Sequence, residues 1–69
     1  MPLSIEVEQE DDGRWLAEIP ELPGVLAYGR TSAEAVARAQ ALALRVMADT
    51  LEHGESLPLG VAGLFAVTA

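Results

Sequence analysis

The segment from Gly13 to Ala35 limits the possible folds more than any other part of the chain. It contains two runs with the character of β-strands, separated by the bend Pro20-Glu21-Leu22-Pro23-Gly24. Proline has no N–H group to donate to a neighbouring strand, so neither Pro20 nor Pro23 suits the middle of a sheet. The bend therefore predicts that the two runs are antiparallel strands joined by a tight connection.

The N-terminal residues predict a strand that precedes these two. Leu3, Ile5 and Val7 alternate with polar residues, a pattern typical of a strand with one face in water. A turn follows at residues 10–13, where Gly13 can adopt a positive φ. This strand and the next are expected to form a hairpin.

The second and third strands are expected at residues 14–19 and 25–29. Trp15, Ala17 and Ile19 share one face of the second strand. Trp15 is predicted to pack beneath a helix as the largest residue of a thin core. Together the three strands form an antiparallel meander.

A capped helix is predicted after the third strand. Thr31-Ser32-Ala33-Glu34 forms a capping box, in which Thr31 accepts from the N–H of Glu34 and the Glu34 carboxylate accepts from the N–H of Thr31. No Gly or Pro interrupts residues 32–53, and Gly54 is expected directly after the helix. The predicted buried stripe comprises Ala35, Ala39, Leu42, Val46 and Thr50, with Ala43 alongside and Val36, Met47 and Leu51 at its margin.

Residues 60–68 contain no charge and predict a fourth strand that is apolar on both faces. A single helix covers only one face of a four-stranded sheet, so the other face needs a cover from elsewhere. The sequence therefore predicts a homo-oligomer, either a dimer or a tetramer. Leu64 and Phe65 in this segment are candidate contact residues.

Composition narrows the classes of function. The 69 residues suffice for one small domain, and the absence of Cys together with a single His excludes disulfides and Cys- or His-rich metal sites. The net charge of −7, with four Arg and no Lys, makes the surface unsuited to nucleic acid and suited to a basic partner. Neither a signal peptide nor a membrane-length apolar stretch occurs, so a cytoplasmic location is expected.

Carboxylates cluster near the first turn, and two interpretations of them are open. A nuclease would use such groups to hold a divalent metal, whereas a strand face running into an acidic turn would only be solvated. The second interpretation is favoured, because no further carboxylate recurs at a matching strand end. We expect no catalytic residue, metal or cofactor. The cluster comprises Glu6, Glu8, Glu10, Asp11 and Asp12.

Taken in order, these motifs resemble the HicB-like antitoxin family. The matching residues are Gly13, Trp15 and Ala17 in the aromatic segment, Pro20, Leu22, Pro23 and Gly24 in the bend, Gly29, Thr31, Glu34 and Ala35 at the helix start, and Gly54, Glu55 and Pro58 after the helix. The family often has Cys after the bend, where this chain has Val25. The resemblance spans nearly all of residues 1–69, as a single domain.

The resemblance implies an α+β fold, β-β-β-α-β, like part of ribonuclease H, with sheet order 3-2-1-4. It also implies a function: antitoxins of this family bind and neutralise a small mRNA-cleaving HicA toxin. Family members often carry a DNA-binding domain after the fourth strand. These 69 residues contain none, so no direct contact with nucleic acid is expected.

Glu21 in the bend and Tyr28 in the third strand are further candidates for partner contact, since Tyr anchors many interfaces. For Glu21 the alternative is a bend that only redirects the chain. At the level of function, an orphan homo-oligomeric adaptor or regulator without a toxin is the main alternative to an antitoxin. A minimal metal-dependent nuclease is a less favoured one.

Overall fold

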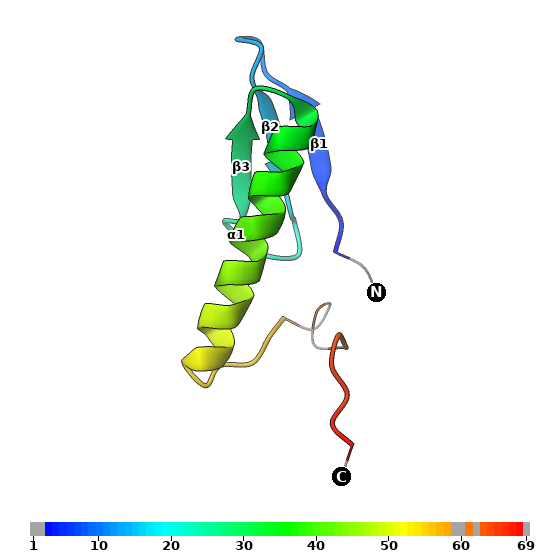
Figure 1. Cartoon of the computed structure of the whole chain (residues 1–69), viewed down its shortest axis with the longest axis vertical. Helices are drawn as coiled ribbons and strands as arrows, with labels where there is room; N and C mark the ends of the chain where they lie inside the picture. The colour runs from blue at the N-terminus through cyan, green and yellow to red at the C-terminus, as the bar shows by residue number, and fades with distance from the viewer. Residues whose placement is uncertain (1–2, 59–60, 62, 69) are drawn as a thin grey trace.

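The computed structural model describes residues 3–58, 61 and 63–68. In this part of the chain, one helix packs on a three-stranded antiparallel sheet with the strand order β1-β2-β3 (Figure 1). The predicted α+β class and the meander are therefore confirmed. The elements are β1 (Glu6–Gln9), β2 (Trp15–Glu18), β3 (Leu26–Gly29) and α1 (Ser32–Glu52).

The acidic turn between β1 and β2 closes as its sequence predicts. The N–H of Glu10 donates to the carbonyl of Arg14 at 2.7 Å, and the N–H of Gly13 donates to the carbonyl of Glu10 at 2.9 Å. Gly13 has φ +91°, a conformation that few side chains tolerate. The turn thus depends on a glycine at this position.

The bend between β2 and β3 both reverses the chain and contributes to the core. The N–H of Ile19 donates to the carbonyl of Val25 at 3.0 Å, which joins the two ends of the bend. Leu22, at its centre, is buried, and Pro20 and Pro23 lie outside the strands as expected. The bend therefore contributes a buried side chain to the core and also connects the two strands.

The start of α1 confirms one half of the predicted capping box and corrects the other. Thr31 Oγ1 accepts from the N–H of Glu34 at 3.0 Å. The Glu34 carboxylate, however, accepts from the N–H of Arg30 at 3.0 Å and not from that of Thr31. Thr31, the N-cap residue, is extended, with φ −130° and ψ 162°.

The helix ends at the predicted place in a Schellman motif. The N–H of Gly54 donates to the carbonyl of Leu51, and the N–H of Glu55 donates to the carbonyl of Thr50, both at 3.0 Å. Gly54 has φ +74°, the left-handed conformation that this motif requires. No helix in the described residues has the length and apolar character needed to cross a bilayer.

The buried row of α1 differs from the predicted stripe. Its members are Ala35, Ala39, Ala43 and Met47, spaced four residues apart. Val46, which was expected in the stripe, is exposed. A row of residues four apart is inclined to the helix axis, so a helix that lies obliquely across a sheet buries such a row. Small alanines in it let the helix approach the sheet closely.

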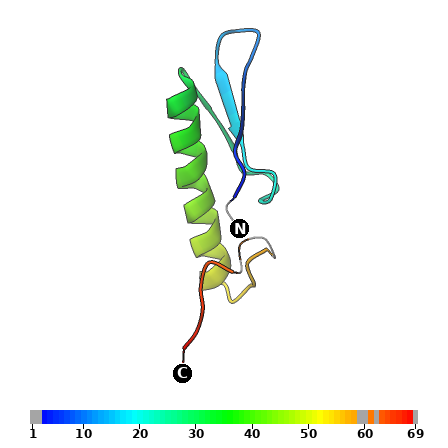
Figure 2. The same cartoon turned by 90° about the vertical axis from the view of Figure 1, so that its right-hand side faces the viewer.

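The core lies between α1 and one face of the sheet, and the opposite face has no covering layer among the described residues (Figure 2). Trp15, which was predicted to be the largest residue of the core, is half-buried and packs against the core without being enclosed in it. Besides the helix row, the core contains Ala17, Ile19, Leu22, Val25 and Val61.

The described part of the predicted fourth strand, residues 61 and 63–68, forms no strand. The N–H of Val61 donates to the carbonyl of Pro58 and the N–H of Leu64 to that of Val61, so the chain turns and Val61 is buried in the core. Beyond this turn, residues 63–68 run away from the sheet (Figure 1). Residues 60 and 62 of the predicted strand lie outside the described residues.

Candidate protein-binding face of the sheet

The pairing of the strands determines which side chains lie on the face of the sheet opposite to α1. Residues that are directly paired across strands point to the same side. Ala17 is buried under the helix, so the paired positions to either side of it in sequence lie on the outer face. This outer face consists of two rows across the sheet, Glu6–Glu18–Leu26 and Glu8–Leu16–Tyr28.

The outer face combines exposed apolar and acidic side chains. Leu26 and Tyr28 are 40% and 37% exposed, and Leu16 between the rows is half-buried. A hollow of about 230 Å³ lies beside them, lined by three glutamates with Val7 and Leu16. Apolar side chains framed by charge are typical of protein interfaces, whose centre is apolar and whose rim is polar.

The glutamates of this face lack cationic partners among the described residues. Glu6 stands directly opposite Glu18 on the neighbouring strand, and the ion pairs found involve neither of them. Like charges in directly paired positions are destabilising. A cation brought by a bound partner would relieve this repulsion.

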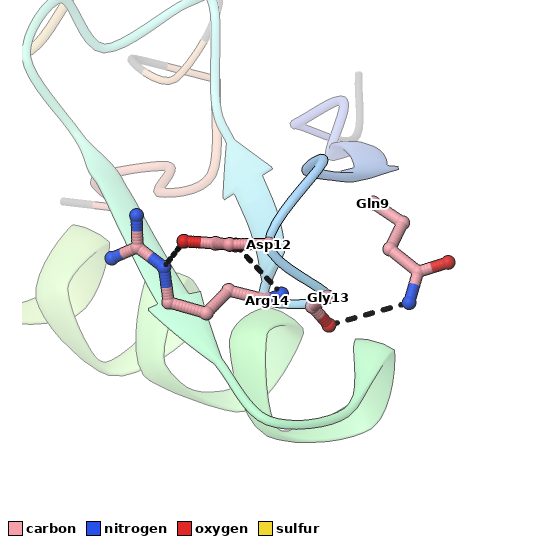
Figure 3. Close-up of polar contacts among 4 residues, drawn as sticks. All are labelled: Gln9, Asp12, Gly13 and Arg14. Carbon is pink, nitrogen blue, oxygen red and sulfur yellow. Dashed lines mark hydrogen bonds and ion pairs between the residues drawn. The ribbon is translucent and has the colours of Figure 1, made fainter.

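Arg14 lies at the edge of the outer face, beside the first turn. Its guanidinium carbon lies 4.4 Å from the ring centroid of Tyr28, a cation–π contact. Asp12 holds Arg14 in place, with Oδ1 accepting from the backbone N–H at 3.0 Å and Oδ2 accepting from Nε at 2.7 Å (Figure 3). These bonds, first the one from the backbone and then the one from the side chain, lower the pKa of the Asp12 carboxyl. Gln9 Nε2 donates to the carbonyl of Gly13 at 3.2 Å and ties the turn to the end of β1 (Figure 3).

Positive charge gathers at one edge of the outer face, around Tyr28. Three of the four arginines line one hollow of about 330 Å³, together with Tyr28, Gly29 and Glu34. Arg38 Nη1 donates to the carbonyl of Tyr28 at 3.1 Å, and Arg38 Nη2 lies 3.5 Å from Glu34 Oε1. The lining arginines are Arg14, Arg30 and Arg38. None of these arginines forms an ion pair with Glu6, Glu8 or Glu18 among the described residues.

The structure separates the four predicted contact residues. Tyr28 lies on the outer face, whereas Leu64 and Phe65 line a hollow at the end of α1. The Glu21 carboxylate accepts from the backbone N–H of Ser4 at 3.2 and 3.1 Å, so it fastens the start of the chain to the bend. Hydrogen bonds from its own backbone N–H and then from Ser4 lower the pKa of the Glu21 carboxyl.

Leu16 and Leu26 are part of the outer face but were not among the predicted contact residues. A signal for them exists in the sequence, because each alternates with a residue that the helix buries. The pattern shows which residues share a face, but not that the helix leaves this face uncovered. That second fact depends on the packing of the whole molecule.

The acidic residues do not converge in the described part of the chain. No group of three or more His, Asp or Glu side chains there has the arrangement to hold a metal ion. His53 Nδ1 lies 2.8 Å from the carbonyl of Asp49 and 3.3 Å from its Oδ1, so the ring pairs with the last turn of α1. This is the helix-end contact that a histidine at such a position commonly makes.

Comparisons with models of protein families, with curated proteins and with solved structures found no match for this chain.

Proposed function

We propose that the chain is an antitoxin-like protein-binding module, which neutralises a small basic mRNA-cleaving toxin of the HicA kind by covering its active site. The observation that carries the proposal is the outer face of the sheet, where Leu16, Leu26 and Tyr28 are exposed or half-buried among unpaired glutamates. The kind of toxin comes from the family resemblance of the sequence. The surface chemistry supports a basic partner independently of that resemblance.

Charge favours such a partner at two stages of binding. At a distance, the net charge of −7 attracts a basic protein and accelerates encounter. At contact, arginine or lysine side chains of the toxin would lie between Glu6 and Glu18 and remove their mutual repulsion. Tyr28 and Leu26 then provide the apolar contact that holds the complex together.

The test is affinity capture from the native lysate with the tagged chain and two variants. The unchanged chain should bring down a small basic protein in near-equal amount. Leu26→Glu, which replaces an exposed apolar side chain of the face with a charge, should lose it. Ala41→Glu adds the same charge on an exposed position of α1 and should retain it.

The captured protein should cleave mRNA when purified alone, and an equal amount of the chain should suppress the cleavage. Capture that Leu26→Glu leaves unchanged would contradict the proposed face. Cleavage of RNA by the chain itself in the presence of a divalent metal would instead favour the nuclease interpretation.

A further inference from the structure

A strip of uncharged surface runs along α1 on the side of β1. Two hollows of about 240 and 230 Å³ lie on it, and Leu44 and Met47 line both. None of the residues that line either hollow is charged, although 22% of the chain is charged. Leu44 is 65% exposed on this strip. The first hollow also contains Leu3 and Ile5 next to β1, and the second contains Leu51, Leu57, Leu64 and Phe65.

The first hollow adjoins an open edge of the sheet. β1 pairs only with β2 among the described residues. The N–H groups of Ser4 and Glu10 point toward the bend and β2, where they donate to Glu21 and Arg14. Because alternate N–H groups of a strand point to opposite edges, those of Val7 and Gln9 point to the open edge. The edge at β3 differs, since Arg38 already donates to the carbonyl of Tyr28 there.

Residues 63–68 form an uncharged, exposed arm, of which Leu64 and Phe65 line the hollow at the end of α1. Val67 is 98% exposed, and Phe65 is 69% exposed. No backbone hydrogen bond joins residues 65–68 to another described segment. Figures 1 and 2 both show the arm leaving the body of the molecule beyond the end of α1. An exposed apolar segment of this kind is able to pair with an open edge of a sheet.

The arm matches the strip in chemistry and the open edge in length. Residues 65–68, if fully extended, would span about 13 Å, as do the four residues of β1. The arm and the strip are both uncharged, whereas the molecule as a whole carries a net charge of −7 and would repel a second copy. Two copies can therefore approach each other most readily through these parts.

We propose that two copies exchange their arms: residues 63–68 of each copy lie along the open edge of β1 in the other. Val67 fills the hollow between Leu3, Ile5 and Leu44, and the arm becomes the fourth strand of the other copy's sheet. The exchange is reciprocal, so one symmetric dimer covers both arms and both edges. The outer face of each sheet stays free, so this inference goes beyond the proposed function and does not depend on it.

The first test is the mass of the purified full chain at micromolar concentration, with two variants of equal charge. The full chain should be a dimer. Val67→Asp should raise the dimer Kd roughly tenfold or more, because it places an unpaired charge in an apolar contact. Ser56→Asp adds the same charge at an exposed position outside the strip and should leave the Kd unchanged. A monomeric full chain, or a Val67→Asp variant that dimerises as before, would overturn the proposal.

The second test uses disulfide formation, which has no background because the chain lacks Cys. Mixing a Val67→Cys chain with a Leu3→Cys chain and oxidising should link the two different chains. Replacing the first by Ser56→Cys should abolish the link. If the double variant Leu3→Cys/Val67→Cys instead closes only an internal disulfide, the arm pairs with its own sheet and the exchange is wrong. The Leu26→Glu variant should still dimerise, which separates this result from the partner test above.

Discussion

At the scale of single residues, the junction between β3 and α1 is the tightest point of the fold. Gly29 is buried, and a Cβ atom placed on it would lie 2.5 Å from the backbone nitrogen of Ala35. The obstructing atom belongs to the backbone of α1 and cannot rotate away. Glycine is needed here because of close approach, since its φ is not positive.

Gly29→Ala should therefore destabilise the fold by roughly 1–3 kcal/mol, the usual cost of forcing an extra carbon into a packed site. Urea unfolding measures this change. Gly63→Ala is the matched control, because nothing lies within 4 Å of the added carbon, and its effect should stay within about 0.5 kcal/mol. Equal midpoints for the two variants would show that the junction relaxes freely.

A second prediction at the scale of single residues concerns how Glu21 makes the stability depend on pH. Its folded-state pKa lies below the usual 4.5, so the carboxylate form favours the native state. That stability is complete above the unfolded pKa and is lost as the pH falls through the folded pKa. Glu21→Gln should be less stable than the unchanged chain at neutral pH and should lose less stability on acidification. Urea midpoints at pH about 7 and about 3 measure both effects.

Glu52→Gln is the control for the acid prediction. Glu52 is exposed near the end of α1, and none of the hydrogen bonds or ion pairs found among the described residues involves it. The substitution removes one carboxylate but keeps the hydrogen bonds between Glu21 in the bend and the N–H of Ser4. A pH profile that is the same for Glu21→Gln, Glu52→Gln and the unchanged chain would rule out a stabilising role for this tie.

At the scale of elements, the alanine row of α1 sets the distance between helix and sheet. Ala39 is fully buried in the middle of this row. Ala39→Leu should cost roughly 1–3 kcal/mol of stability through overpacking. Ala41→Leu, on the exposed side of the same helix, should change stability by less than about 0.5 kcal/mol. Thermal or urea unfolding of the pair tests this, and comparable losses in both would mean that the effect is not one of packing.

The elements also show how far local sequence patterns determine this fold. The features that depend on a few neighbouring residues were all predictable. They are the alternation of apolar and polar residues in the strands, the two turns with glycine, the helix cap at Thr31 and the end of the helix at Gly54. The tilt of α1 was not predictable, since it depends on which helical row fits the sheet. Nor was the course of residues 63–68, because whether an uncharged segment joins a sheet depends on the packing of the rest of the fold. Of the candidate face, only Tyr28 was predicted, because the sequence does not show which face of the sheet the helix covers.

At the scale of the whole molecule, acidic and uncharged surfaces are segregated. The outer face of the sheet carries Glu6, Glu8 and Glu18, whereas the strip along α1 has no charged lining residue. The molecule is elongated, with extents of 50 × 22 × 16 Å, so the arm at its end and the outer face are presented separately. Two different associations can therefore coexist, one with a second copy and one with a basic partner.

These two associations should respond to salt in opposite directions. Each copy carries a net charge of −7, so two copies repel each other while a basic partner is attracted. Raising NaCl from about 0.1 to about 1 M shortens the screening length from about 10 to about 3 Å. The dimer Kd should then fall, because repulsion is screened, and the Kd for the captured partner should rise, because attraction is screened.

Sedimentation of the chain alone and titration with the partner measure the two constants. Glu8→Gln, on the outer face, should reduce the salt dependence of partner binding more than that of dimerisation. If both constants moved in the same direction, charge would not be what distinguishes the two surfaces.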